Sequence, residues 1–214
     1  MTFSKRFFKP FILVLAILAV AGLTFQVSST ARANPETNPT ADAQFSPVQI
    51  TVNTTTLSPT SAGDPNDGKC DLREALQAAF TAASKKENTT FNECSTQPGE
   101  TFIVFDPSIA GQTINFAPGD DYLPFINHEV TITGPIVIKG GGLPAMNPPD
   151  SNKDSRLFRV AGSGTLTLLQ MTLKDGFTVG GGGAILGDNN STINLIGVSF
   201  VNNIVYGNGG AIYT

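Results

Sequence analysis

Apolar and polar residues alternate in the C-terminal part of the chain, in a pattern that forms a 27-residue repeat. The segment 166–185 aligns with the segment 193–212 without a gap, and both end in Gly-Gly-Ala-Ile. Leu173 corresponds to Phe200 in this alignment, and residues 130–141 carry a weaker copy of the pattern. Each repeat therefore predicts about three short strands and no helix.

A repeat of this length built from short strands is typical of a parallel β-helix, whose successive coils pair in parallel. A propeller blade would need four strands and about 40 residues, and the leucine spacing of a leucine-rich repeat is missing. We therefore predict an all-β fold, a parallel β-helix with about 27 residues per coil. Leu166 should lie beside Ile193, with the apolar members inward. Asp175 and Asn202 are expected at a corner, where an Asn side chain can satisfy the bent backbone.

One α-helix is predicted, over residues 71–84, where apolar residues recur at helical spacing. Asp71 can cap its first turn, and Glu74, three residues later, completes a capping box. A single helix with one apolar face in a β protein is expected to cover the open end of the first coil. Leu76 and Phe80 should then be buried.

Residues 1–33 are predicted to be a secretory signal peptide. Three basic residues precede an uncharged apolar run at 11–25. Ala31 and Ala33 supply the small residues that signal peptidase requires, so cleavage is expected before Asn34. The alternative is a membrane anchor, but a spanning helix needs about 20 apolar residues, and this run is shorter.

Three further parts are predicted after the signal peptide. Residues 34–47 form a flexible linker. Residues 48–110 form an entry and cap region that contains the helix, and residues 111–214 form the β-helix coils. Because no terminal cap follows the last repeat, we expect a truncated set of coils and therefore a fragment.

The charge of the chain argues against a nucleic-acid partner. The 214 residues include 13 Lys and Arg against 17 Asp and Glu, a net charge of −4. Four of the basic residues and none of the acidic ones lie in the signal peptide, so the processed chain has 9 against 17, a net of −8. Nucleic acids and anionic membrane surfaces would be repelled. No segment after the signal peptide is long enough to span a membrane.

Cys70 and Cys94 are the only cysteines. In an exported protein an even number favours a disulfide, and closing this loop would stabilise the fold by about 3 kcal/mol. Two buried free thiols are the alternative. A zinc site is disfavoured, because His128 is the only histidine and no second cysteine pair exists.

The sequence contains no catalytic constellation, and no cofactor or metal set is predicted. Calcium ligands at Asp64, Asp67 and Asp71 are an alternative, but their spacing is not that of an EF-hand, and a structural turn is favoured. Asp175 becomes Asn in the next repeat, which favours a structural role for this position. A lyase would need an Arg or Lys base beside clustered aspartates, and no such cluster is evident.

Residues 68–80, GKCDLREALQAAF, resemble the C-S-L-R-E-A signature of a family of exported bacterial proteins (CSLREA domain), with Asp71 where that family usually has Ser. The runs TFIVFDPSIAGQTINF and RLFRVAGSGTLTLLQMTLKDG are similar to that family's entry into its coils. The Gly-Gly-Ala-Ile and Phe-x-x-Asn elements resemble repeats of polymorphic outer-membrane and autotransporter-type surface proteins. The resemblance implies a right-handed parallel β-helix on an exported surface protein, with no catalytic residues to transfer.

We therefore expect an exported scaffold, extracellular or at the cell surface, with outer-membrane association as a further option. Its role is expected to be adhesive or structural rather than enzymatic. The alternative is the N-terminal part of a polysaccharide lyase or glycoside hydrolase on a β-helix whose catalytic coils lie elsewhere. The expected partner is an unidentified extracellular ligand, either a polysaccharide or a host or neighbour cell surface.

Overall fold

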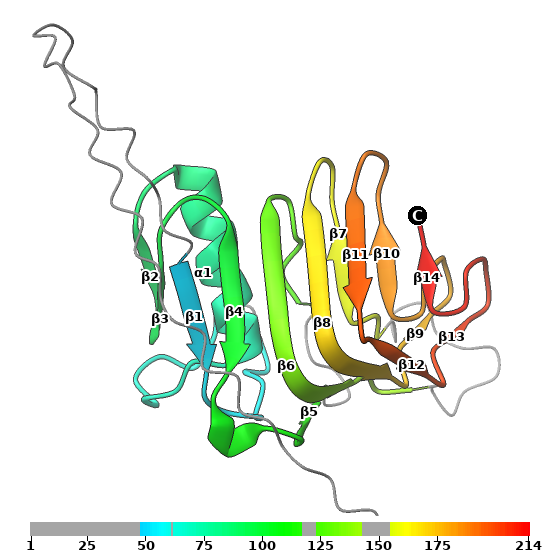
Figure 1. The fold of residues 1–214 in the computed structure, drawn as a ribbon, viewed down its shortest axis with the longest axis horizontal. Helices are drawn as coiled ribbons and strands as arrows, with labels where there is room; N and C mark the ends of the chain where they lie inside the picture. The colour runs from blue at the N-terminus through cyan, green and yellow to red at the C-terminus, as the bar shows by residue number, and fades with distance from the viewer. Residues whose placement is uncertain (1–47, 61, 117–122, 143–154) are drawn as a thin grey trace, which may run out of the picture. The chain divides into compact units, whose positions relative to one another are not determined.

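The computed structural model describes residues 48–60, 62–116, 123–142 and 155–214 of the chain. All of these residues belong to one unit, Ala43–Thr214. Within them the fold is all-β, with one α-helix, α1 (Leu72–Lys85), and one short 3-10 helix, η1 (Pro107–Ile109) (Figure 1). Neither of these described helices is long and apolar enough to cross a bilayer. The predicted signal peptide and linker lie outside the described residues.

The strands of the described part are short, apart from two longer ones. In chain order they are β1 (Val48–Val52), β2 (Thr89–Phe91), β3 (Cys94–Thr96), β4 (Thr101–Phe105), β5 (Thr113–Asn115), β6 (Glu129–Lys139), β7 (Phe158–Val160), β8 (Thr165–Lys174), β9 (Phe177–Thr178), β10 (Ile185–Gly187), β11 (Thr192–Ile196), β12 (Ser199–Val201), β13 (Ile204–Val205) and β14 (Ile212–Tyr213).

These strands form parallel sheets to which the chain returns repeatedly. The largest sheet has the order β1-β4-β6-β8-β11, with β5 also on β6 and β12 also on β8. Between its visits to this sheet the chain contributes to β14-β10-β7 and to β13-β9. All of these pairs are parallel, and only the β2–β3 hairpin is antiparallel.

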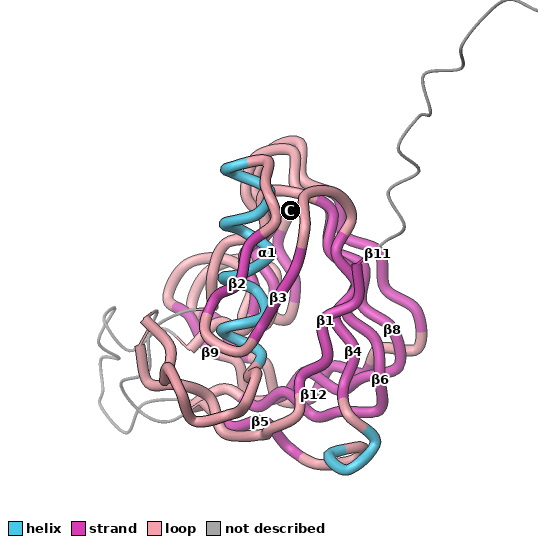
Figure 2. Tube along the Cα trace, turned by 90° about the vertical axis from the view of Figure 1, so that its left-hand side faces the viewer, coloured by secondary structure: helices cyan, strands magenta, loops and turns pink. Residues whose placement is uncertain are grey.

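The largest sheet follows the order of the chain from its first strand to its last. Figure 1 shows its strands side by side in that order. In Figure 2, which looks along the sheet, β1, β4, β6 and β8 lie one behind the other. The helix α1 and the β2–β3 hairpin lie at the end of the sheet formed by β1, and they contact that strand.

The register of these pairs confirms the 27-residue repeat. Leu166 pairs with Ile193, and Ile185 pairs with Ile212. The predicted contact between the two Gly-Gly-Ala-Ile segments is also present, because the N–H of Ala184 donates to the carbonyl of Ala211 at 2.8 Å. Corresponding residues of the two repeats therefore lie on neighbouring strands, as the alternating pattern predicts.

One column of apolar side chains runs through the largest sheet from β1 to β11. It consists of Ile50, Ile103, Ile132, Leu168 and Leu195, paired one to the next. The interval between successive members varies along the chain, and only the last one, from Leu168 to Leu195, equals the predicted repeat. Because side chains alternate along a strand, the column stays aligned only if the additional residues of the longer intervals lie outside its paired segments.

Burial along this column changes at its last member. Ile50 is 3% exposed, and Ile103, Ile132 and Leu168 are each 0% exposed. Leu195 is only half-buried, and no residue from 188 to 214 is fully buried. The last repeat of the described part therefore lacks a covering layer.

β6 and β8 bend sharply near their middles, at an elbow visible in Figure 1. At this elbow Gly134, Gln170 and Gly197 have positive φ values of 141°, 57° and 64°. The buried positions of β8 change phase there, from Leu166 and Leu168 before the elbow to Met171 and Leu173 after it. Two residues, Leu169 and Gln170, separate Leu168 from Met171 instead of one. The apolar side chains before and after the elbow therefore both face the core. Glycine permits the positive φ at Gly134 and Gly197, but Gln170 gives no such signal in the sequence, because Gln does not favour positive φ.

The predicted corner residues adopt matching conformations, with φ values of 54° at Asp175 and 50° at Asn202. The expectation for the Asn side chain needs a correction, because the residue that satisfies the bent backbone is Asn203. Its Oδ1 accepts the N–H of Gly176 and its Nδ2 donates to the carbonyl of Leu173, both at 2.9 Å. Asn203 thus connects one repeat to the preceding one.

The two Gly-Gly-Ala-Ile segments turn in the same way, with φ values of 65° at Gly182 and 66° at Gly209. A Cβ atom on Gly182 would lie 2.0 Å from the carbonyl oxygen of Ile185, and one on Gly209 would lie 2.2 Å from that of Ile212. Both the positive φ and the close carbonyl require glycine at these positions.

Replacing Leu168 by Ala should lower the free energy of unfolding by about 2–5 kcal/mol, because it opens a cavity in a fully buried column. Leu195→Ala is the matched control, since it removes the same side chain from the next position of that column. There the loss should be less than half as large, because Leu195 is already half-exposed. Chemical denaturation of both variants measures the difference, and equal losses would contradict the gradient of burial.

Candidate functional site

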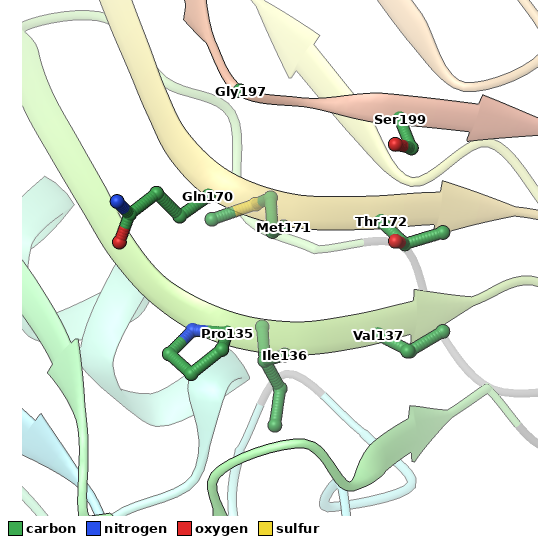
Figure 3. Close-up of a pocket in the computed structure, with 8 residues that line it drawn as sticks. All are labelled: Pro135, Ile136, Val137, Gln170, Met171, Thr172, Gly197 and Ser199. Carbon is green, nitrogen blue, oxygen red and sulfur yellow. The ribbon is translucent and has the colours of Figure 1, made fainter. Parts of the chain in front are cut away.

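A shallow depression of about 350 Å³ lies at the elbow of the largest sheet (Figure 3). It is lined by Pro135, Ile136, Val137, Gln170, Met171, Thr172, Gly197 and Ser199. Gln170, Thr172 and Ser199 supply the polar side-chain atoms, and none of the lining side chains ionises. The depression can therefore donate and accept hydrogen bonds, but it contains no group for acid–base or nucleophilic chemistry at neutral pH.

A second depression, of about 290 Å³, lies between β1 and the β2–β3 hairpin. It is lined by Val48, Asn88, Thr89, Thr90, Ser95, Thr96 and Gln97. The hydroxyls of Thr90 and Ser95 are 3.0 Å apart and hydrogen-bond across the hairpin. This lining is mostly polar, whereas that of the elbow depression is mostly apolar, and neither contains a charged side chain.

The outer face of the largest sheet carries a polar column that crosses three strands. Thr131 pairs with Thr167, and Thr167 pairs with Asn194. The Nδ2 of Asn194 donates to the hydroxyl of Thr167 at 3.2 Å. Exposure rises along the column, because Thr131 is buried, Thr167 half-buried and Asn194 exposed. Hydroxyl and amide groups therefore recur at the spacing of neighbouring strands, about 4.8 Å, and are most accessible toward β11.

The arginines of the repeat region bond to segments of the protein that are distant along the chain. Arg159 forms an ion pair with Asp188 at 3.0 Å, and its guanidinium lies 4.8 Å from the ring centroid of Phe125. Arg156 donates to the hydroxyl of Thr178 at 2.8 Å and to the carbonyl of Gly182 at 3.1 Å. Both guanidiniums thus hold together segments that are distant along the chain.

The aspartates considered as calcium ligands have structural partners. The Oδ1 of Asp67 accepts the N–H of Lys69 at 2.8 Å, within a turn, and the backbone N–H of Asp64 donates to Glu74 at 3.0 Å. Among the described residues, no group of three or more His, Cys, Asp and Glu side chains is placed to hold a metal ion. The Asp67 bond belongs to the turn, whereas the Asp64 bond joins the backbone of this loop to the capping box of α1.

His128 lies on the loop before β6 and is half-buried. Its Nδ1 is 3.1 Å from the side-chain oxygen of Asn127, and within the described part of the chain its Nε2 has no hydrogen-bond partner. Burial lowers the pKa of His128 below its usual value, because a charged imidazolium would lose solvation there. A catalytic triad needs a carboxylate on one ring nitrogen and a nucleophile on the other, so this geometry does not match one.

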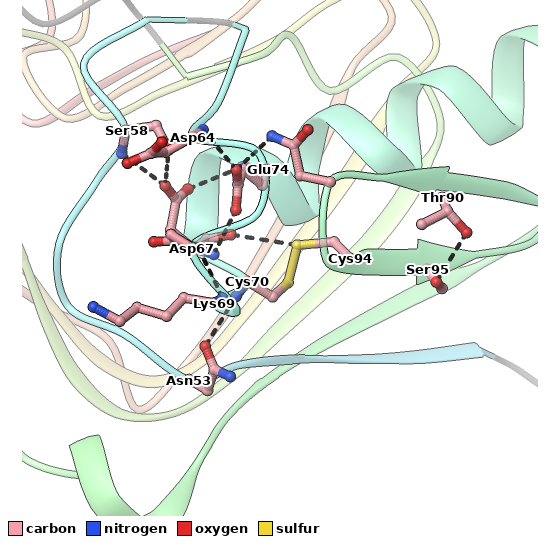
Figure 4. The surroundings of a disulfide bond; sticks show 12 residues. Asn53, Ser58, Asp64, Asp67, Lys69, Cys70, Glu74, Thr90, Cys94 and Ser95 are labelled. Atoms are coloured by element: carbon pink, nitrogen blue, oxygen red, sulfur yellow. Dashed lines mark hydrogen bonds between the residues drawn. A yellow bond between two sulfur atoms is a disulfide. The ribbon is translucent and has the colours of Figure 1, made fainter.

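The predicted capping box is present at the start of α1 (Figure 4). The N–H of Glu74 donates to Oδ1 of Asp71 at 3.0 Å, and the N–H of Asp71 donates to Oε2 of Glu74 at 3.2 Å. Both carboxylates are buried, at 4% and 1% exposure. Their remaining oxygens accept from residues that the sequence pattern does not identify. Ser58 donates to Asp71 through its N–H at 2.7 Å and through its hydroxyl, and Nδ2 of Asn92 donates to Glu74 at 2.6 Å.

The predicted disulfide joins Cys70 to Cys94, with Cα atoms 5.2 Å apart (Figure 4). It links the residue before the cap of α1 to the first residue of β3. Asn53, directly after β1, binds the same cysteine twice: its Oδ1 accepts the N–H of Cys70 at 2.9 Å, and its N–H donates to the Cys70 carbonyl at 3.1 Å. Strand, helix and hairpin are therefore joined at one point.

The buried face of α1 differs from the predicted one. Leu76 is 2% exposed, as expected, but Phe80 is only half-buried. Beyond Leu76, the helix residues with at most 1% exposure are Ala78, Ala79 and Ala82. The helix packs against β1 and the β2–β3 hairpin. Its fully buried side chains beyond Leu76 are small alanines, and Phe80 is not among them.

Comparison with known proteins finds no relative: no family model matches the chain, and no curated protein and no solved structure is significantly similar to it.

Among the residues singled out in the sequence, the fold brings Cys70, Cys94, Asp71 and Glu74 together at the start of α1. Asp175 and Asn202 lie elsewhere, directly after β8 and β12.

Replacing Asp71 by Ala should destabilise the protein by about 2–4 kcal/mol, because it removes the helix cap and leaves the buried Ser58 N–H without its acceptor. Asp67→Ala is the matched control, since Asp67 also accepts a backbone N–H but is exposed. That change should cost less than about 1 kcal/mol. Urea denaturation of the two variants checks the contrast, and a similar loss in both would contradict a structural role for the buried network.

Proposed function

We propose that this chain is an exported scaffold, and that its described part is a right-handed parallel β-helix that begins at a C-S-L-R-E-A-type cap. The parallel register of Leu166 with Ile193 and of Ile185 with Ile212 supports the β-helix, because two separate sheets keep the same 27-residue offset. A hairpin meander would place such repeats antiparallel. The αL corners at Asp175 and Asn202 agree with the same arrangement.

Two observations support export. Residues 1–33 have the composition of a signal peptide, with a basic start, an apolar run and small residues before the cleavage position. The Cys70–Cys94 disulfide belongs in an oxidising compartment, where such bonds persist.

The absence of charged side chains from the lining of both depressions supports the proposal of an adhesive rather than a catalytic role. Gln170, Thr172 and Ser199 at the elbow offer amide and hydroxyl groups to a neutral ligand. The exposed part of the polar column, at Thr167 and Asn194, extends the same chemistry over neighbouring strands. A neutral polysaccharide presents repeated hydroxyls and therefore fits this surface better than an anionic partner. A polysaccharide lyase or hydrolase is the alternative that the binding experiment below also tests.

The β-helix proposal predicts that one whole repeat can be removed. Deleting residues 166–192 joins Thr165 to Ile193, which occupies the position of Leu166. This variant should fold, with a cooperative unfolding transition and a β-sheet circular dichroism spectrum. Deleting residues 166–191 is the matched control, because the one-residue shift turns the apolar side chains outward. If both deletions unfold to the same extent, the β-helix proposal fails.

The functional proposal predicts cleavage before Asn34 on export and binding to a neutral polysaccharide. N-terminal sequencing of the secreted chain tests the first part, and a retained residue 1 would contradict it. For the second, affinity for an array of neutral and acidic polysaccharides is measured for the intact chain and for the Gln170→Ala/Thr172→Ala variant. The variant should bind about tenfold more weakly, because it loses two hydrogen bonds. Thr90→Ala/Ser95→Ala is the control for the other depression.

Two outcomes would count against adhesion. Failure to bind any member of the array would remove the proposed ligand class. Shortening of a bound polysaccharide during incubation would instead identify the enzymatic alternative.

A further inference from the structure

The outward side chains of β8 and β11 before the elbow form rows that run across the strands. Three pairs are in register: Thr165 with Thr192, Thr167 with Asn194, and Leu169 with Ile196. All of these side chains are half-buried or exposed, and we call them the outer face. Neighbouring members of a row are about 4.8 Å apart, and successive rows are about 7 Å apart, twice the rise of one residue.

The three rows of the outer face differ in chemistry. The first row offers two hydroxyls, and the second offers a hydroxyl and an amide, at Thr167 and Asn194. The third row is apolar, and its Ile196 is 59% exposed. Hydrogen-bonding groups therefore lie directly beside an accessible apolar strip.

The outer face carries no charged side chain. Where its rows continue onto β6, they meet Glu129, Thr131 and Thr133, so the only charge in the rows on these three strands is a carboxylate at one corner. An acidic polymer would be repelled there, with no cation in the rows to offset the repulsion. A neutral ligand meets no such cost.

The outer face continues into the elbow depression. Leu169 is followed by Gln170 and Ile196 by Gly197, and the second residue of each pair lines the depression (Figure 3). Gly197 and Gln170 are themselves neighbours, because a Cβ atom on Gly197 would lie 3.8 Å from the Cα atom of Gln170. The apolar third row therefore borders the depression on both strands.

The position of the outer face keeps it accessible to a ligand. Its side chains stand roughly perpendicular to the sheet, whereas strand pairing uses the backbone groups in the plane of the sheet. Figure 1 shows β6, β8 and β11 side by side in that plane. Any further strand that paired with β11 would add a member to each row and would leave Asn194 and Ile196 uncovered.

We propose that the ligand of the outer face and the elbow is an extended, neutral, β-linked polysaccharide whose chain runs across the strands. One ring of such a ribbon-like chain spans about the distance between neighbouring strands, so successive rings meet successive members of a row. Each ring has hydroxyls at its edge and apolar C–H groups on its faces, which match the second and third rows. A coiled, α-linked chain would leave a row after a few rings. This inference rests on the proposed function, because it names the class of polysaccharide bound at that same site.

Oligosaccharides of equal length test the shape of the ligand. Extended β-linked hexamers of glucose, xylose and mannose are compared with the coiled α-linked hexamer of glucose by calorimetric titration of the full chain. At least one extended hexamer should bind tenfold or more tightly than the coiled one. Equal affinity, or a preference for the coiled hexamer, would overturn the inference and leave the proposed neutral ligand class intact. Binding of none of them would overturn both.

Two variants test the place of binding. Thr167→Val/Asn194→Leu removes the hydrogen-bonding groups of the second row and should weaken binding of the tightest extended hexamer at least tenfold, with an unchanged circular dichroism spectrum. Thr131→Val is the matched control, since Thr131 belongs to the same row but is only 8% exposed. It should bind like the parent, and equal losses in the two variants would contradict the inference. If only Gln170→Ala/Thr172→Ala weakens binding, the ligand is confined to the elbow and the inference fails, while the proposed function stands. The comparison of hexamers remains decisive if the double variant does not fold.

Discussion

Parallel pairing of successive repeats is the constraint on which the rest of the structure depends. The column from Ile50 to Leu195 places one apolar side chain above the next at the spacing of neighbouring strands. A shift of one residue in any strand would turn its apolar side chains to the solvent. Changes in repeat length consequently lie in the connections between strands and at the elbow, where β6 has one residue more than β8. The interval between Ile132 and Leu168, for example, is longer than that between Leu168 and Leu195, yet both pairs stay in register.

The features that could be predicted from the sequence are either repeated or local. The 27-residue offset relates two long segments without a gap, so their columns can be aligned by comparing the chain with itself. The capping box depends on two residues three positions apart, and the disulfide joins the only two cysteines. In each case the information lies within a short segment or in the repetition of a pattern.

The missed features depend on partners that are distant in sequence. Ser58 and Asn92 bind the capping carboxylates from 13 and 18 residues away, and no spacing rule connects them. The position of Phe80 could not be predicted because helical periodicity weights large apolar residues, whereas the side chains that are fully buried beyond Leu76 are alanines. Gln170 has no compositional signal for a left-handed conformation. Asn203 could have been found, since it belongs to an Asn pair at the predicted corner.

The distribution of charge explains what the surface can recognise. The buried carboxylates at the start of α1 are satisfied by backbone and amide donors, and the arginines of the repeats hold neighbouring segments. The groups left at the two depressions are neutral. Each hydrogen bond to a neutral ligand contributes little, about 1 kcal/mol, so appreciable affinity requires many equivalent contacts. A column of hydroxyl and amide groups, such as Thr167 and Asn194, supplies them only if the ligand is itself repetitive, as a polymer or a cell surface is.

The two ends of the same apolar column show how a stack of strands can be terminated. At β1 a helix and a hairpin cover the column, and because a helix cannot pair with an edge strand, the junction is held by other bonds. These are the two hydrogen bonds between Asn53 and Cys70 and the disulfide to Cys94. At β11 no such element is present among the described residues, and the side chains are apolar and uncharged. A surface of this kind is covered only by an element that brings both a strand edge and an apolar face, which is the difference between β11 and the covered strand β1.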